Sequence, residues 1–319
     1  MRQYKPIISI IIPSYNKEAY LSDCLLSCIN QTYKEIEIIV VDDCSSDRGI
    51  NLAANILKES DFSYKIITHK SNKGLSAARN TGLSHASGKY IFFLDADDTI
   101  DYNLLEVLLS AKQSCNSLHV VPFARIRRFS NIRELNVQSD VPEKVKTGVS
   151  WELCKKNYHY YAWGSLLDRS IIEKYDVLFR EDIKKHEDII FLAEYLSHVH
   201  QGKLVESNYN YRVTPNSITS QCAFMDRINV LKEMYLLLYK TTITDFSSII
   251  TFTRILRNGV FLAEDYPFNY CDMKKLPHVP LNYIVRSKIS FVKKCFESLL
   301  IIPVIEYSVY RLLRYIVKA

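Results

Sequence analysis

The amino-acid sequence predicts an α/β fold with a mostly parallel central sheet, followed by a mainly helical C-terminal region. Short runs of β-branched and aromatic residues recur every 26 to 29 residues in the first hundred positions. Segments with the apolar spacing of amphipathic helices separate these runs. Polar residues follow three of the runs directly. An alternation of strands and helices is typical of right-handed βαβ units.

Four of the apolar runs are predicted as strands of one sheet. They cover residues 7–12, 36–41, 64–67 and 90–94. Because each run is apolar along its whole length, we expect both of its faces to be covered, as in parallel sheets.

Helices are predicted between these strands. We expect Asn16 to cap the first helix, and two more helices to cover about residues 48–59 and 74–86. In the first helix the apolar positions follow the spacing of one helix face: Leu21, Cys24, Leu25, Cys28 and Ile29.

The rhythm of the sequence changes after about residue 115. We expect one domain over residues 1–220 and a helical region over residues 221–319. Their predicted parts are a strand at 118–123, a polar stretch at 130–147, a helix with an acidic start at 186–196 and mostly helical structure at 222–265.

Positive charge is concentrated at the C-terminal end. The chain has a net charge of +6, and residues 281–319 carry seven basic and two acidic residues. Residues 304–318, which follow Pro303, form a basic amphipathic pattern. Such a helix is typical of a membrane-surface anchor, although docking on its own domain or on a dimer partner is an alternative.

Other sequence features indicate a cytoplasmic protein. The apolar run 7–12 is too short for a signal peptide, and no stretch has 18 uninterrupted apolar residues that would span a membrane. The eight cysteines form no C-x-x-C pair, so we expect reduced thiols.

The strand at 90–94 leads directly into Asp95, Asp97 and Asp98. Like charges 4 Å apart repel by about 4 kcal/mol at an effective dielectric of 20, so we expect a bound cation. Carboxylate oxygens suit Mg²⁺ or Mn²⁺. The alternatives are a solvated turn and, for Asp98, a cap on a helix that starts near residue 101.

Polar clusters also follow the first two strands, at Ser14–Asn16 and Asp42–Asp43. The carboxyl ends of parallel strands meet at one edge of a sheet, so we expect these clusters and the aspartates after residue 94 to converge. The chain has no G-x-x-x-x-G-K-[ST] loop and no G-x-G-x-x-G fingerprint. Their absence argues against a P-loop enzyme and a dinucleotide-dependent oxidoreductase.

Five stretches together resemble the family 2 glycosyltransferases. They are SIIIPSYNKEAYLSDCLLSCINQTY, EIIVVDDCSSD, NKGLSAARNTGL, GKYIFFLDADD and HEDIIF, in the order of that family. The resemblance is clear over residues 7–100 and has a second anchor at 186–191. It implies a Rossmann-like GT-A fold, with a nucleotide-binding half at 1–115 and an acceptor-binding half at 116–220.

The resemblance also implies which residues bind the nucleotide sugar. Tyr15 would stack on uracil, and Asp43 would hydrogen-bond the base. Asp97, together with Asp95, would bind a Mn²⁺ or Mg²⁺ ion that spans the diphosphate. The full set is Pro13, Tyr15, Asn16, Asp42, Asp43, Arg79, Asn80, Asp95 and Ala96.

Four of these residues also have a structural alternative. Tyr15 would then be a rim aromatic, and Asp43, like Asp42, a cap on the helix after Ser46. Arg79 would be a solvated helix residue or the partner of a nearby aspartate.

The family pattern E-D-x-x-F matches Glu187, Asp188 and Phe191. It implies that Asp188 is the base that deprotonates the acceptor hydroxyl, with inversion at the anomeric carbon. Acidic residues also favour helix N-termini, which is the alternative role. Trp163, Gly164 and Glu187 match the acceptor side, although Trp163 also suits core packing; Arg212 is a candidate for diphosphate contact.

The resemblance therefore implies an inverting, metal-dependent glycosyltransferase that uses a nucleotide sugar, most simply a UDP-sugar. The acceptor would be a glycan or lipid-linked sugar of bacterial cell-surface polysaccharide, such as lipopolysaccharide, O-antigen or capsule. The enzyme would lie on the cytoplasmic face of the inner membrane, without a nucleic-acid partner and with a homodimer as an open alternative. The sequence has no Q-x-x-R-W motif of processive synthases. A catalytically inactive binding module and a nucleotidyltransferase are the competing functions.

Overall fold

The chain divides into two compact units, residues 1–220 and 221–319. The computed structural model describes residues 6–114, 120–132, 161–185, 187–196, 198–199 and 201–214, all in the first unit. The predicted helices at 222–265, the basic tail at 304–318 and most of the polar stretch at 130–147 lie outside the described residues.

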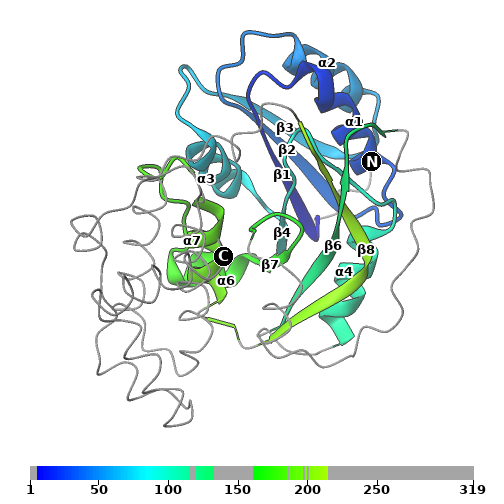
Figure 1. The fold of residues 1–319 in the computed structure, drawn as a ribbon, viewed down its shortest axis with the longest axis vertical. Helices are drawn as coiled ribbons and strands as arrows, with labels where there is room; N and C mark the ends of the chain where they lie inside the picture. Colours follow the sequence, from blue (N-terminus) through cyan, green and yellow to red (C-terminus); the bar gives the residue numbers. More distant parts are fainter. Residues whose placement is uncertain are drawn as a thin grey trace, which may run out of the picture. The chain divides into compact units, whose positions relative to one another are not determined.

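A five-stranded sheet forms the centre of the first unit (Figure 1), with the strand order β3-β2-β1-β4-β7. The first four strands are parallel, and β7 is antiparallel to β4. The prediction of a mostly parallel sheet is therefore confirmed. The strands are β1 (Ile8–Ser14), β2 (Ile36–Asp42), β3 (Ser63–Thr68), β4 (Tyr90–Phe93) and β7 (Leu166–Asp168).

The strands differ in how deeply they are buried. Every residue of β1, β2 and β4 is buried. The expectation that all four predicted strands are covered on both faces is wrong for β3, whose residues are partly or fully exposed. The reason is its place at the edge of the sheet, where it has β2 as a neighbour on one side alone.

Helices cover both faces of the central sheet. Figure 1 shows α1 and α2 on one side and α3 on the other. They are α1 (Glu18–Ile29), α2 (Gly49–Lys58) and α3 (Leu75–His85). The last of these packs very close to β1, because a Cβ atom at Gly82 would overlap the side chain of Ile11.

The start of α1 differs from the prediction. Asn16 is not its N-cap: it has a left-handed backbone with φ of 52°, and the helix begins at Glu18 after Lys17. The side-chain amide oxygen of Asn16 instead accepts a hydrogen bond from the Ser46 N–H at 2.9 Å. The Asn16 side chain therefore connects the loop after β1 to the loop after β2 and does not cap α1.

A second sheet of three strands follows in the order β5-β8-β6. Helix α4 packs against both β6 and β8. The elements of this part are β5 (Thr99–Ile100), α4 (Leu104–Ser114), β6 (Val120–Phe129), α6 (Arg169–Tyr175), α7 (Glu187–Leu196) and β8 (Gln201–Arg212). Because β5 stands between Asp98 and α4, the alternative that Asp98 caps a helix near residue 101 does not hold.

None of the helices in the described part of the chain is long and apolar enough to cross a membrane. Three cysteines fall within that part, and all three are free: Cys24 and Cys28 are buried and Cys44 is exposed.

Candidate functional site

The polar clusters after β1, β2 and β4 meet at the carboxyl edge of the sheet, as predicted. From β1 the chain continues to β2 on one side, whereas β4 lies on the other side, so the strand order reverses here. The Asn16 N–H donates to Ser45 Oγ at 2.9 Å, which joins the ends of β1 and β2. Lys17 Nζ lies 2.5 Å from Asp97 Oδ2, which joins the ends of β1 and β4.

Asp95 and Asp97 are the residues best placed to hold a cation. Arg79 Nη2 donates to Asp95 Oδ1 at 2.8 Å, and the two aspartate side chains are 22% and 20% exposed. The second oxygen of each carboxylate, Asp95 Oδ2 and Asp97 Oδ1, has no hydrogen bond to any described residue. Two partly exposed carboxylates with free oxygens suit a hard divalent ion whose remaining ligands come from substrate and water. The described residues contain no larger cluster of metal-binding side chains.

Asp98 has a structural position behind this pair. It is buried, and its carboxylate accepts hydrogen bonds from the Arg212 N–H at 2.7 Å and the Tyr209 hydroxyl at 2.8 Å. Burial raises the pKa of the Asp98 carboxyl well above its usual range, and the charges of Asp97 and Asp95 raise it further. Burial and the charges of Asp95 and Asp97 therefore disfavour a third negative charge at this turn.

Arg79 connects the aspartate turn to the start of α7. Its guanidinium is buried and donates to Glu187 Oε1 at 2.6 Å as well as to Asp95. The same group lies over the Phe179 ring at 5.2 Å. Burial alone would lower the pKa of Arg79, but the charges of Asp95, Glu187 and Asp188 raise it. Of the sequence alternatives for Arg79, the structure bears out partnership with a nearby aspartate.

Helix α7 brings Glu187 and Asp188 to this site. Both residues stand in the first turn of the helix and are buried. Phe191, one turn later, stacks on Phe179 with ring centroids 4.0 Å apart, which fixes the helix against the loop below Arg79. The neighbouring position His186 lies outside the described residues.

The residues matched to the nucleotide base lie at the ends of β1 and β2. Tyr15 is 48% exposed, so its ring is open to a ligand, whereas Pro13 is buried in β1. Asp42 Oδ1 accepts from the Ser45 N–H at 3.1 Å.

Asp43 holds the loop before α3, because its carboxylate accepts from the N–H groups of Lys73 and Gly74 at 2.8 Å and 2.7 Å. Its Oδ1 atom also lies 2.8 Å from His69 Nδ1. Asp43 is therefore not the cap of α2. Its contact with a base stays a prediction.

Two other matched residues, the half-buried Asn80 and the buried Ala96, contact the protein itself. The Asn80 side chain donates to the Phe179 carbonyl at 2.9 Å and accepts from the Phe179 N–H at 2.9 Å. This amide therefore fixes the loop that supports Arg79. Ala96, between the two partly exposed aspartates, is 2% exposed.

Trp163 stands within a stack of aromatic rings. Its ring centroid lies 4.5 Å from that of Tyr161 and 4.5 Å from that of Tyr209. Trp163 is buried, which agrees with core packing, and Gly164 has a φ of 73°. The Tyr209 hydroxyl accepts from the Asp95 N–H at 3.1 Å, so the stack reaches the aspartate turn.

Arg212 also contacts the turn that contains Asp95 and Asp97. Its Nε donates to the Asp97 carbonyl at 2.8 Å, and Nη2 donates to Asp23 Oδ2 at 2.8 Å. The guanidinium also lies over the rings of Tyr20 and Phe129. These contacts anchor the loop that carries Asp97.

Sequence reasoning missed two residues of this site, Lys17 and Tyr209. Lys17 stands in the quoted segment SYNKEAYL, directly after the polar residues that were singled out, so position was a usable signal. Tyr209 had no such signal, since 111 residues separate it from the Asp98 carboxylate that it contacts.

Comparison with known proteins identifies relatives of this chain. The family model described as glycosyl transferase family 2 matches residues 9–176. The uncharacterised glycosyltransferase EpsJ of Bacillus subtilis is 33% identical over 220 residues, which are 67% of this chain and 63% of EpsJ. Escherichia coli WfgD, named UDP-Glc:alpha-D-GlcNAc-diphosphoundecaprenol beta-1,3-glucosyltransferase, is 31% identical over 219 residues, which are 67% of this chain and 80% of WfgD. The match thus spans less than two thirds of EpsJ.

Solved structures show the same fold. TarS residues 1–349 of S. aureus, in complex with UDP-GlcNAc, superpose with a TM-score of 0.67 at 19% identity, over 88% of this chain and 81% of that chain. The mannosyltransferase PcManGT of Pyrobaculum calidifontis, in complex with GDP-Man and Mn²⁺, gives a TM-score of 0.54 at 17% identity, over 98% and 84% of the two chains. The predicted GT-A fold is therefore confirmed.

Proposed function

The chain belongs to glycosyl transferase family 2, and we propose that it is an inverting enzyme that moves a sugar from a UDP-sugar to an acceptor hydroxyl. The acceptor is a glycan or a lipid-linked sugar in the synthesis of a bacterial cell-surface polysaccharide. The family name supports a transferase. The donor, the acceptor and the stereochemistry are the proposal.

One observation carries this proposal most directly. Arg79 pairs with Asp95 at 2.8 Å and with Glu187 at 2.6 Å, so the aspartate turn and the start of α7 share one guanidinium. A transferase needs its donor-binding acids and its base close together, because both must reach the same anomeric carbon. The Arg79 contacts support such an arrangement for Asp188, the residue next to Glu187.

Printed names of relatives support the choice of substrates. WfgD is named for UDP-Glc and for an acceptor sugar on diphosphoundecaprenol. TarS was solved with UDP and with UDP-GlcNAc. Tyr15, 48% exposed at the end of β1, offers a ring on which a uracil base can stack.

The proposed reaction is a single displacement. Asp188 takes the proton of the acceptor hydroxyl while that oxygen forms a bond to the anomeric carbon. The bond from the anomeric carbon to the phosphate oxygen breaks on the opposite side, and its electron pair leaves with the nucleoside diphosphate. One displacement inverts the anomeric configuration. A positioned base contributes about 10²–10⁴-fold to such a rate.

Asp95 and Asp97 would hold a Mn²⁺ or Mg²⁺ ion, since each has a carboxylate oxygen free of hydrogen bonds to the described residues. Such an ion stabilises the negative charge of the leaving diphosphate. Lys17, 2.5 Å from Asp97, adds a second positive charge on the side of β1. The Mn²⁺ in the complex of PcManGT supports this choice of ion.

We also propose that the enzyme works at the cytoplasmic face of the inner membrane. The support is the basic amphipathic pattern at 304–318 in the sequence. A lipid-linked acceptor would lie at that surface.

Release of UDP from a panel of UDP-sugars, with Mn²⁺ and without it, tests the proposed function. We expect one donor to give UDP release that stops when Mn²⁺ is removed by a chelator. A configuration assay on the product, by the coupling constant of its anomeric proton, tests inversion. Absence of both donor binding and UDP release over the whole panel would refute the transferase.

A further inference from the structure

The two faces of the β6–β8 pair carry different chemistry. Arg128 of β6 lies beside Tyr211 of β8, and Arg127 lies beside Asn210. Side chains alternate between the faces of a strand, so Arg128 and Tyr211 share one face. Arg125 and Arg127 stand on the opposite face.

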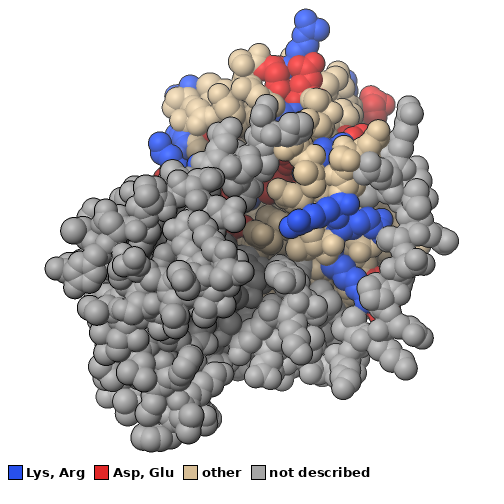
Figure 2. Space-filling view, in the orientation of Figure 1, with Lys and Arg blue, Asp and Glu red and all other residues tan. Residues whose placement is uncertain are grey.

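The three arginines of β6 differ in their partners. Arg125 pairs with Glu206 at 3.7 Å, and Arg127 pairs with Asp101 at 3.6 Å. Arg128 is exposed, and no acidic residue of the described chain forms an ion pair with it. Figure 2 shows Lys and Arg side chains on the surface where Figure 1 draws β6 and β8. Of the three arginines, Arg128 is the one whose charge no acidic residue of the described chain neutralises, so it is available to a ligand.

An aromatic stack adjoins Arg128. The Tyr211 ring lies 5.7 Å from the Trp163 ring with an interplanar angle of 17°, and the Trp163 ring lies 4.5 Å from the Tyr161 ring with an angle of 7°. Tyr161 is partly exposed at the outer end of this stack. Aromatic rings with an apolar body and a polar hydroxyl suit ligands such as sugars, which have apolar ring faces and polar edges.

The stack leads to the reacting groups. At its inner end Tyr209 stacks on Trp163 at 4.5 Å, and its hydroxyl accepts from the Asp95 N–H. At its outer end, burial raises the pKa of Tyr161, the charge of Asp188 raises it further, and the charge of Arg128 lowers it. The charges of Asp188 and Arg128 therefore both lie close enough to Tyr161 to shift its pKa, in opposite directions.

We propose that Arg128, Tyr161 and Tyr211 bind an acceptor sugar that carries a phosphate or diphosphate, with the buried Trp163 holding the two tyrosine rings in place. Arg128 contacts the phosphate oxygens, which a planar guanidinium matches in pairs. The rings of Tyr161 and Tyr211 contact the sugar, and the acceptor hydroxyl faces Asp188. This inference rests on the proposed function, because it takes Asp188 as the base. It adds that the acceptor is anionic and names the residue that reads its charge.

Binding of two matched probes tests this surface. The charged probe is an octyl-linked α-N-acetylglucosamine diphosphate, and the neutral probe is octyl α-N-acetylglucosaminide. Calorimetric titrations of the full chain with saturating UDP and Mn²⁺ keep the charged probe from the donor site. We expect the wild type to bind the charged probe at least about tenfold more tightly than the neutral one, with a preference that falls as salt is added.

Two variants assign this preference to one residue. Arg128→Gln is expected to bind both probes about equally. Arg127→Gln, which removes a charge from the opposite face of the same strand, is expected to keep the wild-type preference. Thermal unfolding of both variants shows that the fold is intact, and Arg128→Lys checks whether charge alone restores part of the preference.

Two results would overturn the inference: a wild type without a preference for the charged probe, including one that binds neither probe, or an Arg128→Gln variant that keeps the preference. Both differ from failure of the proposed function. That failure would appear as absence of UDP-sugar binding and UDP release in the wild type, whereas a wrong acceptor assignment leaves donor binding unchanged.

Discussion

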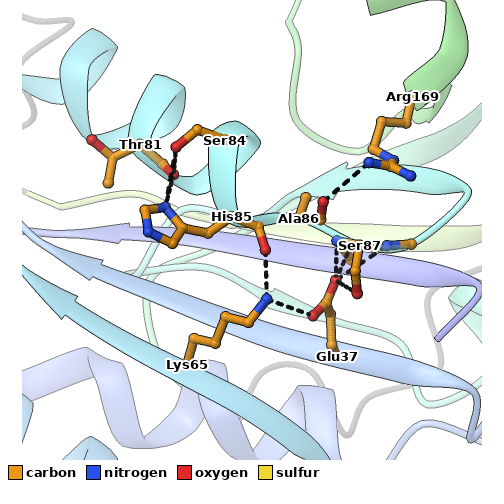
Figure 3. A network of polar contacts seen from close by, with 10 residues as sticks. Glu37, Lys65, Thr81, Ser84, His85, Ala86, Ser87 and Arg169 are labelled. Atoms are coloured by element: carbon orange, nitrogen blue, oxygen red, sulfur yellow. Dashed lines mark hydrogen bonds and ion pairs between the residues drawn. The ribbon is translucent and has the colours of Figure 1, made fainter. Parts of the chain in front are cut away.

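Two acidic sites lie at opposite ends of the central sheet, one buried and one partly exposed, and the chain satisfies them differently. At the amino end, Glu37 Oε1 accepts from Ser9 Oγ at 2.6 Å and from the Ser87 N–H at 2.6 Å. Its Oε2 lies 3.4 Å from Lys65 Nζ. Both carboxylate oxygens of Glu37 therefore contact the protein. Figure 3 shows that Lys65 also donates to the His85 carbonyl.

At the carboxyl end, the protein satisfies half of each carboxylate. Arg79 bonds one oxygen of Asp95 and Lys17 bonds one oxygen of Asp97. The other oxygen of each has no hydrogen bond to the part of the chain that is described. Buried polar groups without partners are costly, so a stable fold completes those that have only a structural role. Incomplete carboxylates in a partly exposed position therefore indicate where a ligand belongs.

The largest expected effect concerns Asp188. Asp188→Asn keeps the size of the side chain and removes the base, so we expect turnover to fall about 10³-fold with sugar-nucleotide binding nearly unchanged. Single-turnover rates and calorimetric binding measure the two quantities. Asp182→Asn, on the exposed loop before α7, is the matched control. Wild-type turnover in Asp188→Asn would remove this residue from the mechanism.

Arg79→Lys sharpens the comparison, because it keeps the charge but cannot contact two carboxylates with one planar group. We expect kcat to fall about 10²-fold, since a misplacement of 1 Å costs on that order, and KM for the donor to change little. The control is Arg169→Lys, whose partner Glu173 is exposed. If Arg79→Lys lowers thermal stability but the folded fraction keeps the wild-type kcat, the role of Arg79 is only structural.

Glu37→Gln is expected to act on stability and not on activity. Loss of charge-assisted hydrogen bonds to a buried carboxylate lowers the free energy of unfolding by about 2 kcal/mol. Urea unfolding measures this change, with Glu59→Gln at the exposed end of α2 as the control. A tenfold fall in kcat without a change in stability would contradict the division of roles between the two ends.

The same variant should change the pH dependence of stability. Burial raises the pKa of Glu37, but hydrogen bonds from Ser9 and Ser87 and the charge of Lys65 outweigh burial and lower it. A carboxyl whose pKa is lowered in the folded state stabilises the protein at pH values above its ordinary pKa. This stabilisation is lost as the pH falls through the folded-state pKa. We therefore expect the free energy of unfolding to fall more in the wild type than in Glu37→Gln as the pH is lowered from about 5. Urea unfolding at each pH measures this difference.

The smallest expected effect concerns Lys17. Its ammonium group competes with a divalent ion for Asp97, so Lys17→Met should tighten Mn²⁺ binding without nucleotide about fivefold. That factor corresponds to about 1 kcal/mol between unit charges 4 Å apart in water. Electron paramagnetic resonance of free Mn²⁺ measures it. Lys65→Met, which removes the corresponding lysine at the Glu37 end, should leave Mn²⁺ affinity unchanged, and weaker binding in Lys17→Met would contradict the competition.

Local patterns were enough to predict the parallel strands and the convergence of polar clusters, because both follow from runs of neighbouring residues. They did not predict the exposure of β3, which depends on strand order and not on its own sequence. They also left a local cap open as an alternative for Asp98, whose contacts are instead with the distant Tyr209 and Arg212.

The charge arrangement of the site needed the structure. Arg79 and Glu187 are 108 positions apart, and no spacing rule connects residues at such a distance. The sequence left open whether Arg79 was solvated or paired. Only the folded chain shows that it is buried between two acids.

The close approach of α3 to β1 has a consequence for the guanidinium one turn earlier. Gly82 leaves no room for a methyl group against Ile11. The absence of a side chain at this position therefore allows α3 to pack closely on β1. Gly82→Ala would lift that turn from the strand and raise Arg79 out of reach of its two acids. Gly82, which contacts Ile11, would thereby set the position of Arg79 relative to Asp95 and Glu187.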